Sequence, residues 1–174
     1  PMSPRTPLRV SVVIMAFNEE DSLPAQIART VTYAQDTFAE WEIIVVDDGS
    51  SDGTAACVER AAATQPCVRL LRHASNRGMG AAIRSGYGAA RLDWVTQLPA
   101  DGQVRAPVFD HFLPFLPDTP LVIGRYARRA DGPLRGALTW GFRQVARWLV
   151  WHPCDFTGTQ FLRRDLLART TIDA

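Results

Sequence analysis

An α/β domain with a mainly parallel sheet is the fold class that the sequence predicts, and three observations support it. Short apolar runs rich in β-branched residues alternate with stretches of helical periodicity between residues 9 and 125. The apolar runs are continuous, which is typical of strands buried on both faces of a parallel sheet. A polar segment follows each run, at the place where a strand would end. No internal repeat or linker interrupts the pattern, so we expect a single domain.

The first strand, helix and strand set the pattern. RVSVVIMAF (9–17) and EIIVVDD (42–48) are the first two predicted strands. The stretch between them has apolar residues at helical spacing: Leu23, Ile27, Val31 and Ala34. Ser22 and Pro24 mark the expected start of this helix. Strand, helix and strand in this order form the unit that takes a right-handed crossover in nearly all sheets.

The alternation continues to residue 125. The further expected elements are a helix at 54–63, a strand at 67–73, a helix at 80–91, a strand at 94–100, a short helix at 108–116 and a strand at 120–125. Sheets of this kind bind their ligands outside the carboxyl ends of the strands. The polar residues at those ends are therefore the candidates for function.

The composition is that of a soluble globular protein. The chain has 174 residues, of which 47% are hydrophobic and 21% charged. Its apolar runs are far shorter than the roughly 20 residues that span a bilayer, and the N-terminus lacks a secretory signal pattern. We therefore expect a cytoplasmic location, soluble or peripheral on the inner face of the cell membrane. The net charge of +1 argues against nucleic-acid binding, and the three cysteines lack the spacing of a zinc site.

Polar segments follow the first four predicted strands: FNEED, DDGSSDGT, SNRGMG and PADGQ. Each segment alone is also compatible with an ordinary turn or helix cap. A dinucleotide-binding glycine pattern is excluded, because GMGAAIRSG follows the third strand and the turn after the first strand has no glycine. A P-loop is excluded as well, since all 19 basic residues are arginine and the pattern needs a lysine.

A nucleotide and metal site at the strand ends is the remaining interpretation. The carboxylates and the amide after the first two strands suit ribose hydroxyls and base edges. Asp101 and Gln103, after the fourth strand, offer hard oxygen ligands. Such ligands suit Mg²⁺ or Mn²⁺ bound together with substrate phosphates. The predicted ligand is therefore a nucleoside diphosphate with a divalent metal.

Six segments add a more specific indication: VSVVIMAFNEE, EIIVVDDGSSDGT, NRGMGAAIRSG, PADGQ, GRYARR and DFTGTQFLRRDLL. In this order they resemble the motifs of family 2 glycosyltransferases, in the branch of dolichyl-phosphate mannose synthases and bacterial polyprenyl-phosphate transferases. The resemblance covers residues 9–167. It implies the GT-A fold, with a Rossmann-like, mainly parallel sheet flanked by helices. It also implies a hexosyltransferase that moves a sugar from a GDP- or UDP-sugar to a polyprenyl phosphate.

The resemblance implies roles for single residues as well. The implied nucleotide contacts are Ala16, Phe17, Glu19, Asp47, Asp48, Gly78 and Ala100. Asp101 matches the last acid of the family's D-x-D motif, and Gln103 matches an amide that assists it at the metal. Asp101 and Arg125, which matches an arginine near the phosphates, are the implied catalytic residues. Pro99 stands where the motif has its first acid, and Met15 replaces a usual proline. We expect weakened metal binding without the donor, and retained activity.

Residues 126–151 are predicted to form an acceptor loop and a membrane-surface helix. Residues 124–154 contain six arginines and one acid. Arg143 and Arg147 fall opposite an apolar helical face. Two tryptophans lie beside them: Trp140 and Trp151. This pattern is typical of an interfacial helix, although a helix packed on the core with solvated arginines is the alternative. Arg135 is a further catalytic candidate, for neutralising phosphate oxygens.

Two other functions stay open on the sequence. A saccharide hydroxyl acceptor in cell-envelope polysaccharide synthesis would need a base, for which Asp131 and Asp155 are the candidates. A non-catalytic nucleotide-binding or scaffold domain is the other alternative, and Pro99 favours it. Residues 1–174 are expected to form a GT-A catalytic domain that is either incomplete at its C-terminus or completed by a membrane protein partner.

Overall fold

The computed structural model describes residues 6–124 and 159–169. Within them, six strands form one sheet in the order β3-β2-β1-β4-β6-β5. The strands are β1 (Thr6–Ala16), β2 (Phe38–Asp47), β3 (Val68–Arg72), β4 (Trp94–Pro99), β5 (Leu121–Ile123) and β6 (Gln160–Arg163). The helices are α1 (Leu23–Thr37), α2 (Thr54–Thr64), α3 (Met79–Ala89) and α5 (Arg164–Arg169), with the 3-10 helices η1 (Ala106–His111) and η2 (Leu113–Phe115).

The strands β1 to β4 are parallel. β1 pairs with β2 and β4, and β2 pairs with β3 on its other side. Ala16 lies opposite Asp47, and Met15 lies opposite Pro99, so the carboxyl ends of β1, β2 and β4 meet at one edge of the sheet. β6 is antiparallel to β4. The predicted α/β fold with a mainly parallel sheet is therefore confirmed.

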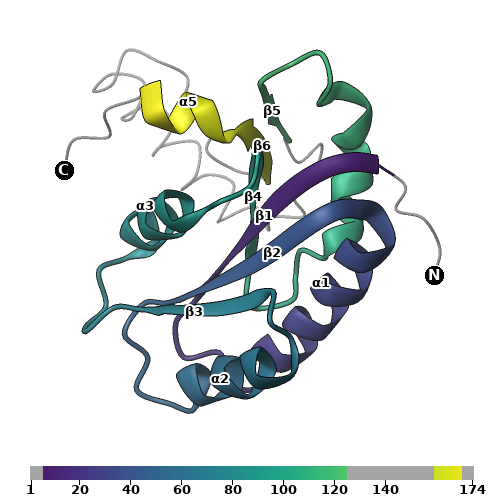
Figure 1. Cartoon of the computed structure of the whole chain (residues 1–174). Helices are drawn as coiled ribbons and strands as arrows, with labels where there is room; N and C mark the ends of the chain where they lie inside the picture. The colour runs from purple at the N-terminus through teal and green to yellow at the C-terminus, as the bar shows by residue number, and fades with distance from the viewer. Residues whose placement is uncertain (1–5, 125–158, 170–174) are drawn as a thin grey trace, which may run out of the picture. The chain divides into compact units, whose positions relative to one another are not determined.

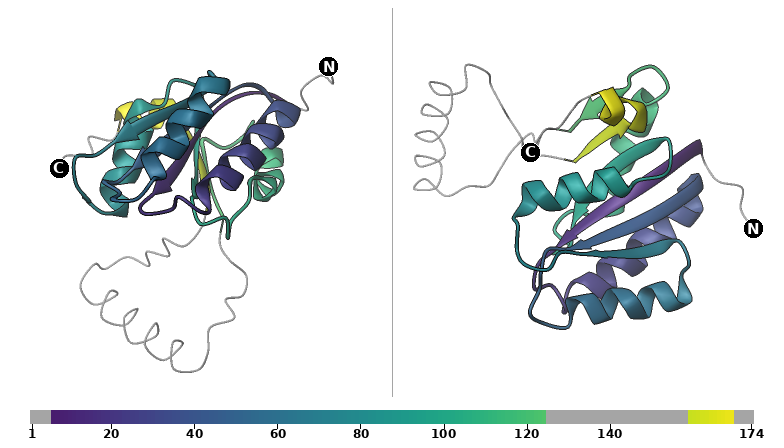
Figure 2. Two further views of the ribbon diagram at one scale, coloured as in Figure 1. Left: turned by 90° about the horizontal axis from the view of Figure 1, so that it is seen from below. Right: turned by 60° about the vertical axis from the view of Figure 1, so that its left-hand side comes forward.

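Helices cover both faces of this sheet (Figure 1; Figure 2). α1 and α2 lie on one face and α3 lies on the other. Side chains alternate between the faces along β1: Val12 and Ile14 belong to the core on the α1 side, and Val13 belongs to the core on the α3 side. The apolar run of β1 is continuous because both of its faces are buried.

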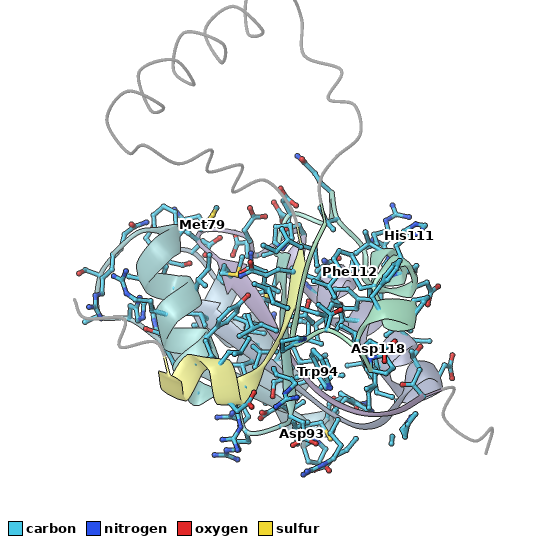
Figure 3. The ribbon with its side chains drawn as sticks, turned by 90° about the horizontal axis from the view of Figure 1, so that it is seen from above. Met79, Asp93, Trp94, His111, Phe112 and Asp118 are labelled. Carbon is cyan, nitrogen blue, oxygen red and sulfur yellow. The ribbon has the colours of Figure 1, made fainter. Side chains whose placement is uncertain are left out.

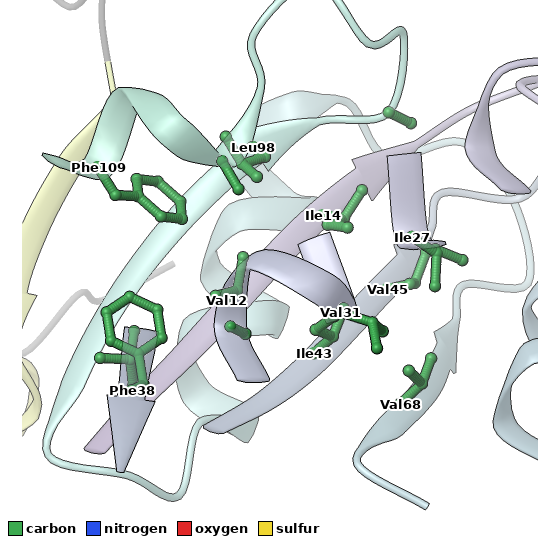
Figure 4. Packing of buried hydrophobic residues seen from close by; sticks show 14 of the residues in the cluster. Val12, Ile14, Ile27, Val31, Phe38, Ile43, Val45, Val68, Leu98 and Phe109 are labelled. Atoms are coloured by element: carbon green, nitrogen blue, oxygen red, sulfur yellow. The ribbon is translucent and has the colours of Figure 1, made fainter. Parts of the chain in front are cut away.

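Aromatic and branched side chains fill the core on the α1 side (Figure 4). Val12, Ile14, Ile43 and Leu98 from three neighbouring strands are fully buried. Phe109 of η1 lies on the same side, and its ring meets that of Phe161 edge to face, with centroids 4.9 Å apart. This packing fixes the position of β4, whose carboxyl end leads into the loop that contains Asp101.

Residues 106–115 form two 3-10 helices, η1 and η2, in place of the single short helix expected at 108–116. A proline stands in the first turn of each: Pro107 and Pro114. Pro114 has no backbone N–H to donate and its ring clashes with the preceding turn, so a helix from η1 cannot continue through it. The strand β6 was not expected, because its four residues gain strand structure through pairing with β4.

The chain divides into two compact units, residues 1–122 with 160–174, and residues 123–159. Most of the second unit lies outside the described residues, and so do the predicted acceptor segment 126–151, Arg125 and Arg135. These predictions, and the expectation of a single domain, stay predictions. The two ends of the inserted stretch are joined, since the Gly124 N–H donates to the Thr159 carbonyl at 2.9 Å. Within the described ranges, no helix is both long and apolar enough to cross a bilayer.

Candidate active site

A cavity of about 260 Å³ opens at the carboxyl ends of β1 and β4, beside the start of α3. Its walls are Met15, Ala16, Phe17, Glu19, Asp48, Met79, Ala82, Pro99, Ala100 and Asp101. Small-molecule sites usually measure roughly 300 to 1,000 Å³, so this cavity suits part of a nucleotide. Phe17 is 45% exposed and Met79 is 67% exposed. The wall therefore offers a ring and a thioether to an apolar face such as that of a base.

The loop after β1 is tied to the loop after β2. Asn18 has a left-handed backbone conformation, with φ 54°, and its N–H donates to Ser50 Oγ at 2.9 Å. In return, the N–H of Ser51 donates to Asn18 Oδ1 at 2.9 Å. The polar residues of these two segments therefore hold the loops together, and this fixes the cavity wall at Phe17.

Asp47, a predicted nucleotide contact, is fully buried. Its Oδ1 accepts the Ser50 N–H at 2.9 Å. Its Oδ2 lies 3.1 Å from Arg72 Nε, an ion pair without the geometry of a hydrogen bond. The Asp47 carboxylate therefore organises the turn after β2 and is separate from the cavity walls. Its contact with a nucleotide stays a prediction.

Asp48 lies in the cavity wall, and only 4% of it is exposed. Its Oδ1 lies 2.6 Å from His73 Nδ1 and accepts the Arg77 N–H at 3.0 Å, while Oδ2 accepts the Gly78 N–H at 2.7 Å. His73 Nε2 lies 2.8 Å from Ser85 Oγ on α3. Burial raises the pKa of the Asp48 carboxyl, but the hydrogen bonds from His73 and the two backbone N–H groups outweigh burial, so the pKa is lowered. Asp48 therefore holds the loop before α3 against the end of β2.

Asp101 lies on the tight loop after β4. Gly102 has φ +71°, a left-handed conformation that glycine adopts without strain. Asp101 Oδ1 accepts the Gln103 N–H at 2.9 Å, which is the hydrogen bond of an Asx turn. The side chain is exposed, and among the described residues its Oδ2 accepts no hydrogen bond. The loop is thus a turn that leaves a carboxylate oxygen available to a ligand.

Asp101 and Gln103 are donors of the kind that Mg²⁺ and Mn²⁺ prefer. Residues 6–124 and 159–169 contain no group of three or more His, Cys, Asp or Glu side chains that could hold a metal alone. Mg²⁺ is usually held by one or two carboxylates together with substrate phosphates and water. The single carboxylate of Asp101 fits that mode, and Pro99, which pairs with Met15, adds no ligand.

Most of the predicted nucleotide residues meet in one place. Those that line the cavity together with Asp101 are Ala16, Phe17, Glu19, Asp48 and Ala100. Gly78 is not among the lining residues, but its N–H donates to Asp48 Oδ2, and Gln103 lies on the same turn as Asp101. Arg125 and Arg135 lie outside the described residues.

Sequence reasoning missed four wall residues: Met15, Met79, Ala82 and Pro99. Met79 begins α3 and lies within SNRGMG, the polar segment after the third predicted strand, so its place in the chain was a usable signal. Met15 and Pro99 became neighbours only through the register of β1 with β4. That register cannot be read from either segment alone.

A larger cavity, of about 720 Å³, lies at the amino end of β4. Its walls include Tyr87, Asp93, Trp94 and Arg163. Figure 3 shows Met79, beside the first cavity, and Asp93 at opposite ends of the strands. Burial raises the pKa of Tyr87 to about 12, and its hydroxyl donates to Gln97 and accepts from Gln160, each at 3.0 Å. This buried hydroxyl is already satisfied, and the cavity lies away from the carboxyl ends, so the smaller cavity is the candidate active site.

The chain matches the family described as Glycosyl transferase family 2 over residues 11–170. It belongs to this family. Over 103 residues it is 36% identical to a dolichyl-phosphate beta-glucosyltransferase of Trichomonas vaginalis. These residues cover 56% of this chain and 31% of that protein. Over 97 residues it is 43% identical to an undecaprenyl-phosphate 4-deoxy-4-formamido-L-arabinose transferase of Serratia proteamaculans, covering 55% and 29% of the two chains.

A solved structure with a similar fold is a mannosyltransferase from Pyrobaculum calidifontis in complex with GDP-Man and Mn²⁺. The TM-score is 0.66 and the identity 23%, and the likeness covers 96% of this chain and 48% of that chain. The predicted GT-A fold and family 2 membership are confirmed. The chain spans about a third of the length of these two relatives and about half of the mannosyltransferase.

Proposed function

We propose that this glycosyltransferase moves a hexose from a GDP- or UDP-sugar to a polyprenyl phosphate, with Mg²⁺ or Mn²⁺ at Asp101 and Gln103. The observation that carries the proposal is the cavity itself, which joins Phe17, Asp48 and Asp101 at the carboxyl ends of parallel strands. Such ends are where α/β sheets bind their ligands. The relatives that are named for dolichyl and undecaprenyl phosphate support the acceptor class.

Five of the wall residues have proposed parts in donor binding: Phe17, Met79, Glu19, Asp48 and Asp101. The exposed ring of Phe17 is available to stack on the base, with Met79 as a second apolar surface. Glu19 lies in the wall, and its N–H donates to Thr54 Oγ1 at 2.8 Å, so its backbone is fixed. Asp48 shapes the wall, because its oxygens are already occupied by protein donors. The diphosphate would then extend toward Asp101.

The reaction breaks the bond between the anomeric carbon and a diphosphate oxygen, and forms a bond between that carbon and an oxygen of the acceptor phosphate. The bonding electron pair leaves with the nucleoside diphosphate. A bound Mg²⁺ or Mn²⁺ supplies positive charge to the leaving diphosphate. The polyprenyl phosphate is anionic near neutral pH, since the second pKa of a phosphate monoester is about 6, so the chain needs no general base to activate it.

Arg125 and Arg135 are proposed to neutralise phosphate oxygens during this step, since preorganised positive charge stabilises the charge that develops in the transition state. Both lie outside the described residues. Their proposed role rests on the resemblance of GRYARR to its family segment and on the arginine-rich sequence between residues 124 and 154.

A transfer assay tests the function. Radiolabelled GDP- and UDP-sugars are offered to the full chain with undecaprenyl phosphate or an oligosaccharide, in Mn²⁺ or in EDTA. We expect label in the lipid phosphate and a large loss in EDTA. Label in the oligosaccharide alone would favour the saccharide acceptor. Calorimetric nucleotide binding that ignores Mn²⁺, without turnover, would instead indicate the non-catalytic domain that Pro99 favours.

The proposed site of action is the inner face of the cell membrane, with residues 126–151 as the acceptor loop and membrane-surface helix, and a membrane protein as a further partner. Liposome co-sedimentation of the chain and its Arg143→Glu/Arg147→Glu variant tests the membrane contact. Interfacial arginines gain from anionic lipid, so we expect the double variant to bind less. Equal and salt-insensitive binding by both proteins would remove the proposed contact.

A further inference from the structure

Gln26 is an unusual residue for its place on α1. Only 1% of Gln26 is exposed, on a buried helix face whose other residues are Leu23, Ile27, Val31 and Ala34 with two threonines, Thr30 and Thr37. A buried amide is unfavourable unless its donors and acceptor find partners. Its partners therefore indicate what this side chain does in the structure.

Both N–H groups of the Gln26 side chain donate to backbone carbonyls at the end of β4 and in the loop after it. Its Nε2 donates to the Pro99 carbonyl at 3.1 Å and to the Val104 carbonyl at 2.8 Å. These two carbonyls stand on either side of residues 100–103, the turn that contains Asp101. One amide group on α1 thus holds both ends of this turn.

The oxygen of Gln26 faces the middle of the same turn. Among the described residues, Gln26 Oε1 is buried without a hydrogen-bond partner. It lies 4.0 Å from the position that a β-carbon on Gly102 would take, which is ordinary van der Waals contact. The Gln26 side chain therefore holds the turn at its two ends through Nε2, while its oxygen lies near Gly102 without a hydrogen bond.

The turn has one further internal tie, the hydrogen bond from the Gln103 N–H to Asp101 Oδ1. That bond orients the carboxylate relative to its own backbone, but it does not fix the turn relative to the rest of the domain. The start of the turn is tied to β1 by the Ala100 N–H, which donates to the Met15 carbonyl at 3.1 Å. The two bonds from Gln26 tie both of its ends to α1, which is packed into the core. Catalytic groups need placement of this kind to within about 0.5 Å.

We propose that Gln26 is the positioning residue of the metal loop: it sets the place of Asp101 without touching nucleotide or metal. The inference rests on the proposed function, in which Asp101 binds the metal. Removal of the Gln26 donors should loosen residues 100–103 and weaken metal binding, while the Phe17 side of the cavity keeps its affinity for the nucleotide.

The test uses Gln26→Met, which keeps the length of the side chain and removes both donors. Gln26→Glu is the second variant, because it has nearly the same shape but no N–H groups. Thr30→Val is the matched control. Thr30 is also 1% exposed on α1, and its hydroxyl donates to the backbone carbonyl of Gln26 at 2.8 Å, a bond within the helix that does not reach the turn.

Three quantities are measured on the full chain. They are amide hydrogen exchange in the peptide that covers residues 98–105, Mn²⁺ affinity by electron paramagnetic resonance with GDP or UDP present, and nucleotide affinity in EDTA. Loss of two hydrogen bonds predicts exchange about tenfold faster and Mn²⁺ binding about tenfold weaker in both Gln26 variants. Nucleotide affinity in EDTA should stay within about twofold, and Thr30→Val should match the wild type in all three.

The outcomes separate the inference from the function on which it rests. If wild-type protein binds both nucleotide and Mn²⁺, but the Gln26 variants match it in exchange or in Mn²⁺ affinity, the positioning role is wrong and the function stands. If wild-type protein binds neither ligand, the proposed function fails and the role of Gln26 fails with it.

Discussion

Asp48 and Asp101 line the same cavity, yet their surroundings differ. The Asp48 carboxylate is buried and accepts hydrogen bonds from His73 and from two backbone N–H groups. The Asp101 carboxylate is exposed and accepts one N–H from its own turn. The same chemical group thus builds the wall in one loop and is left available to a ligand in the other. The two regions, the packed loops after β2 and β3 and the open loop after β4, should respond differently to substitution.

Gly49→Ala should have the largest effect, because it enters the packed region. Gly49 has φ +75°, and an added β-carbon would lie 2.4 Å from the carbonyl carbon of Ser75 and 2.6 Å from the N of Asn76. Left-handed strain and a backbone clash together predict a loss on the order of 3 kcal/mol in the free energy of unfolding. Urea denaturation measures it. A loss below about 1 kcal/mol would show that this region yields more easily than its packing indicates.

Asp101→Asn should lower sugar transfer about 100-fold, equivalent to roughly 2.7 kcal/mol in the barrier, and leave the melting temperature unchanged. The asparagine oxygen can still accept the Gln103 N–H, but the negative charge is lost. Asp118→Asn is the matched control, since Asp118 is an exposed aspartate in another turn (Figure 3). Full turnover by Asp101→Asn, or equal losses in both variants, would contradict a metal role for this carboxylate.

Asp48→Asn should lower stability by about 2 kcal/mol at pH 7, because an amide cannot accept all the hydrogen bonds that the carboxylate receives. The effect should depend on pH. The pKa of Asp48 is lowered in the folded chain, so its stabilisation is present above the unfolded pKa of about 3.9 and is lost as pH falls through the folded pKa. Urea unfolding at pH 7 and pH 3 should show the wild type and the variant converging in acid. If the two proteins differed by the same unfolding free energy at pH 7 and pH 3, the Asp48 carboxyl would not be stabilising the folded chain through its ionised form.

Gly102→Ala should have the smallest effect of the four. Gly102 has φ +71°, close to that of Gly49, but the nearest atom to an added β-carbon is Gln26 Oε1 at 4.0 Å. The strain of a left-handed alanine remains, which predicts a loss of about 1 kcal/mol without a clash. Urea denaturation of the two glycine variants, Gly102→Ala and Gly49→Ala, measures how much the backbone clash at Gly49 adds to the strain that both share. Equal losses of unfolding free energy in the two variants would show that the loop after β2 is no more tightly packed than the loop after β4.

The order of the elements could be predicted from the sequence because it depends on local pattern. The runs at 9–17 and 42–48 became β1 and β2, and the helical spacing from Leu23 to Ala34 became α1. β6 could not be predicted in this way, since its residues become a strand by pairing with β4, which lies more than 60 positions earlier in the chain.

The site was predictable as a set of strand ends, but its division of labour was not. Asp47 and Asp48 are adjacent in the sequence and look alike there. In the structure one is paired with Arg72 and the other with His73. Arg72 is the last residue of β3 and lies opposite Asp47 in the sheet register, and His73 follows it. Gln26 gave no signal either, because its two acceptors lie more than 70 positions away. Long-range contacts of this kind are the part that composition and spacing do not contain.

The hydrogen bond between Gly124 and Thr159 has a consequence for protein engineering and for divergence within the family. It closes a stretch of chain whose exit and return lie side by side, whereas every wall residue of the cavity comes before residue 102. Lengthening a closed loop is inexpensive, at about 0.6 kcal/mol for each doubling of its length. We therefore expect that a graft with its junctions at these two residues exchanges the whole stretch between them and keeps every residue that lines the cavity.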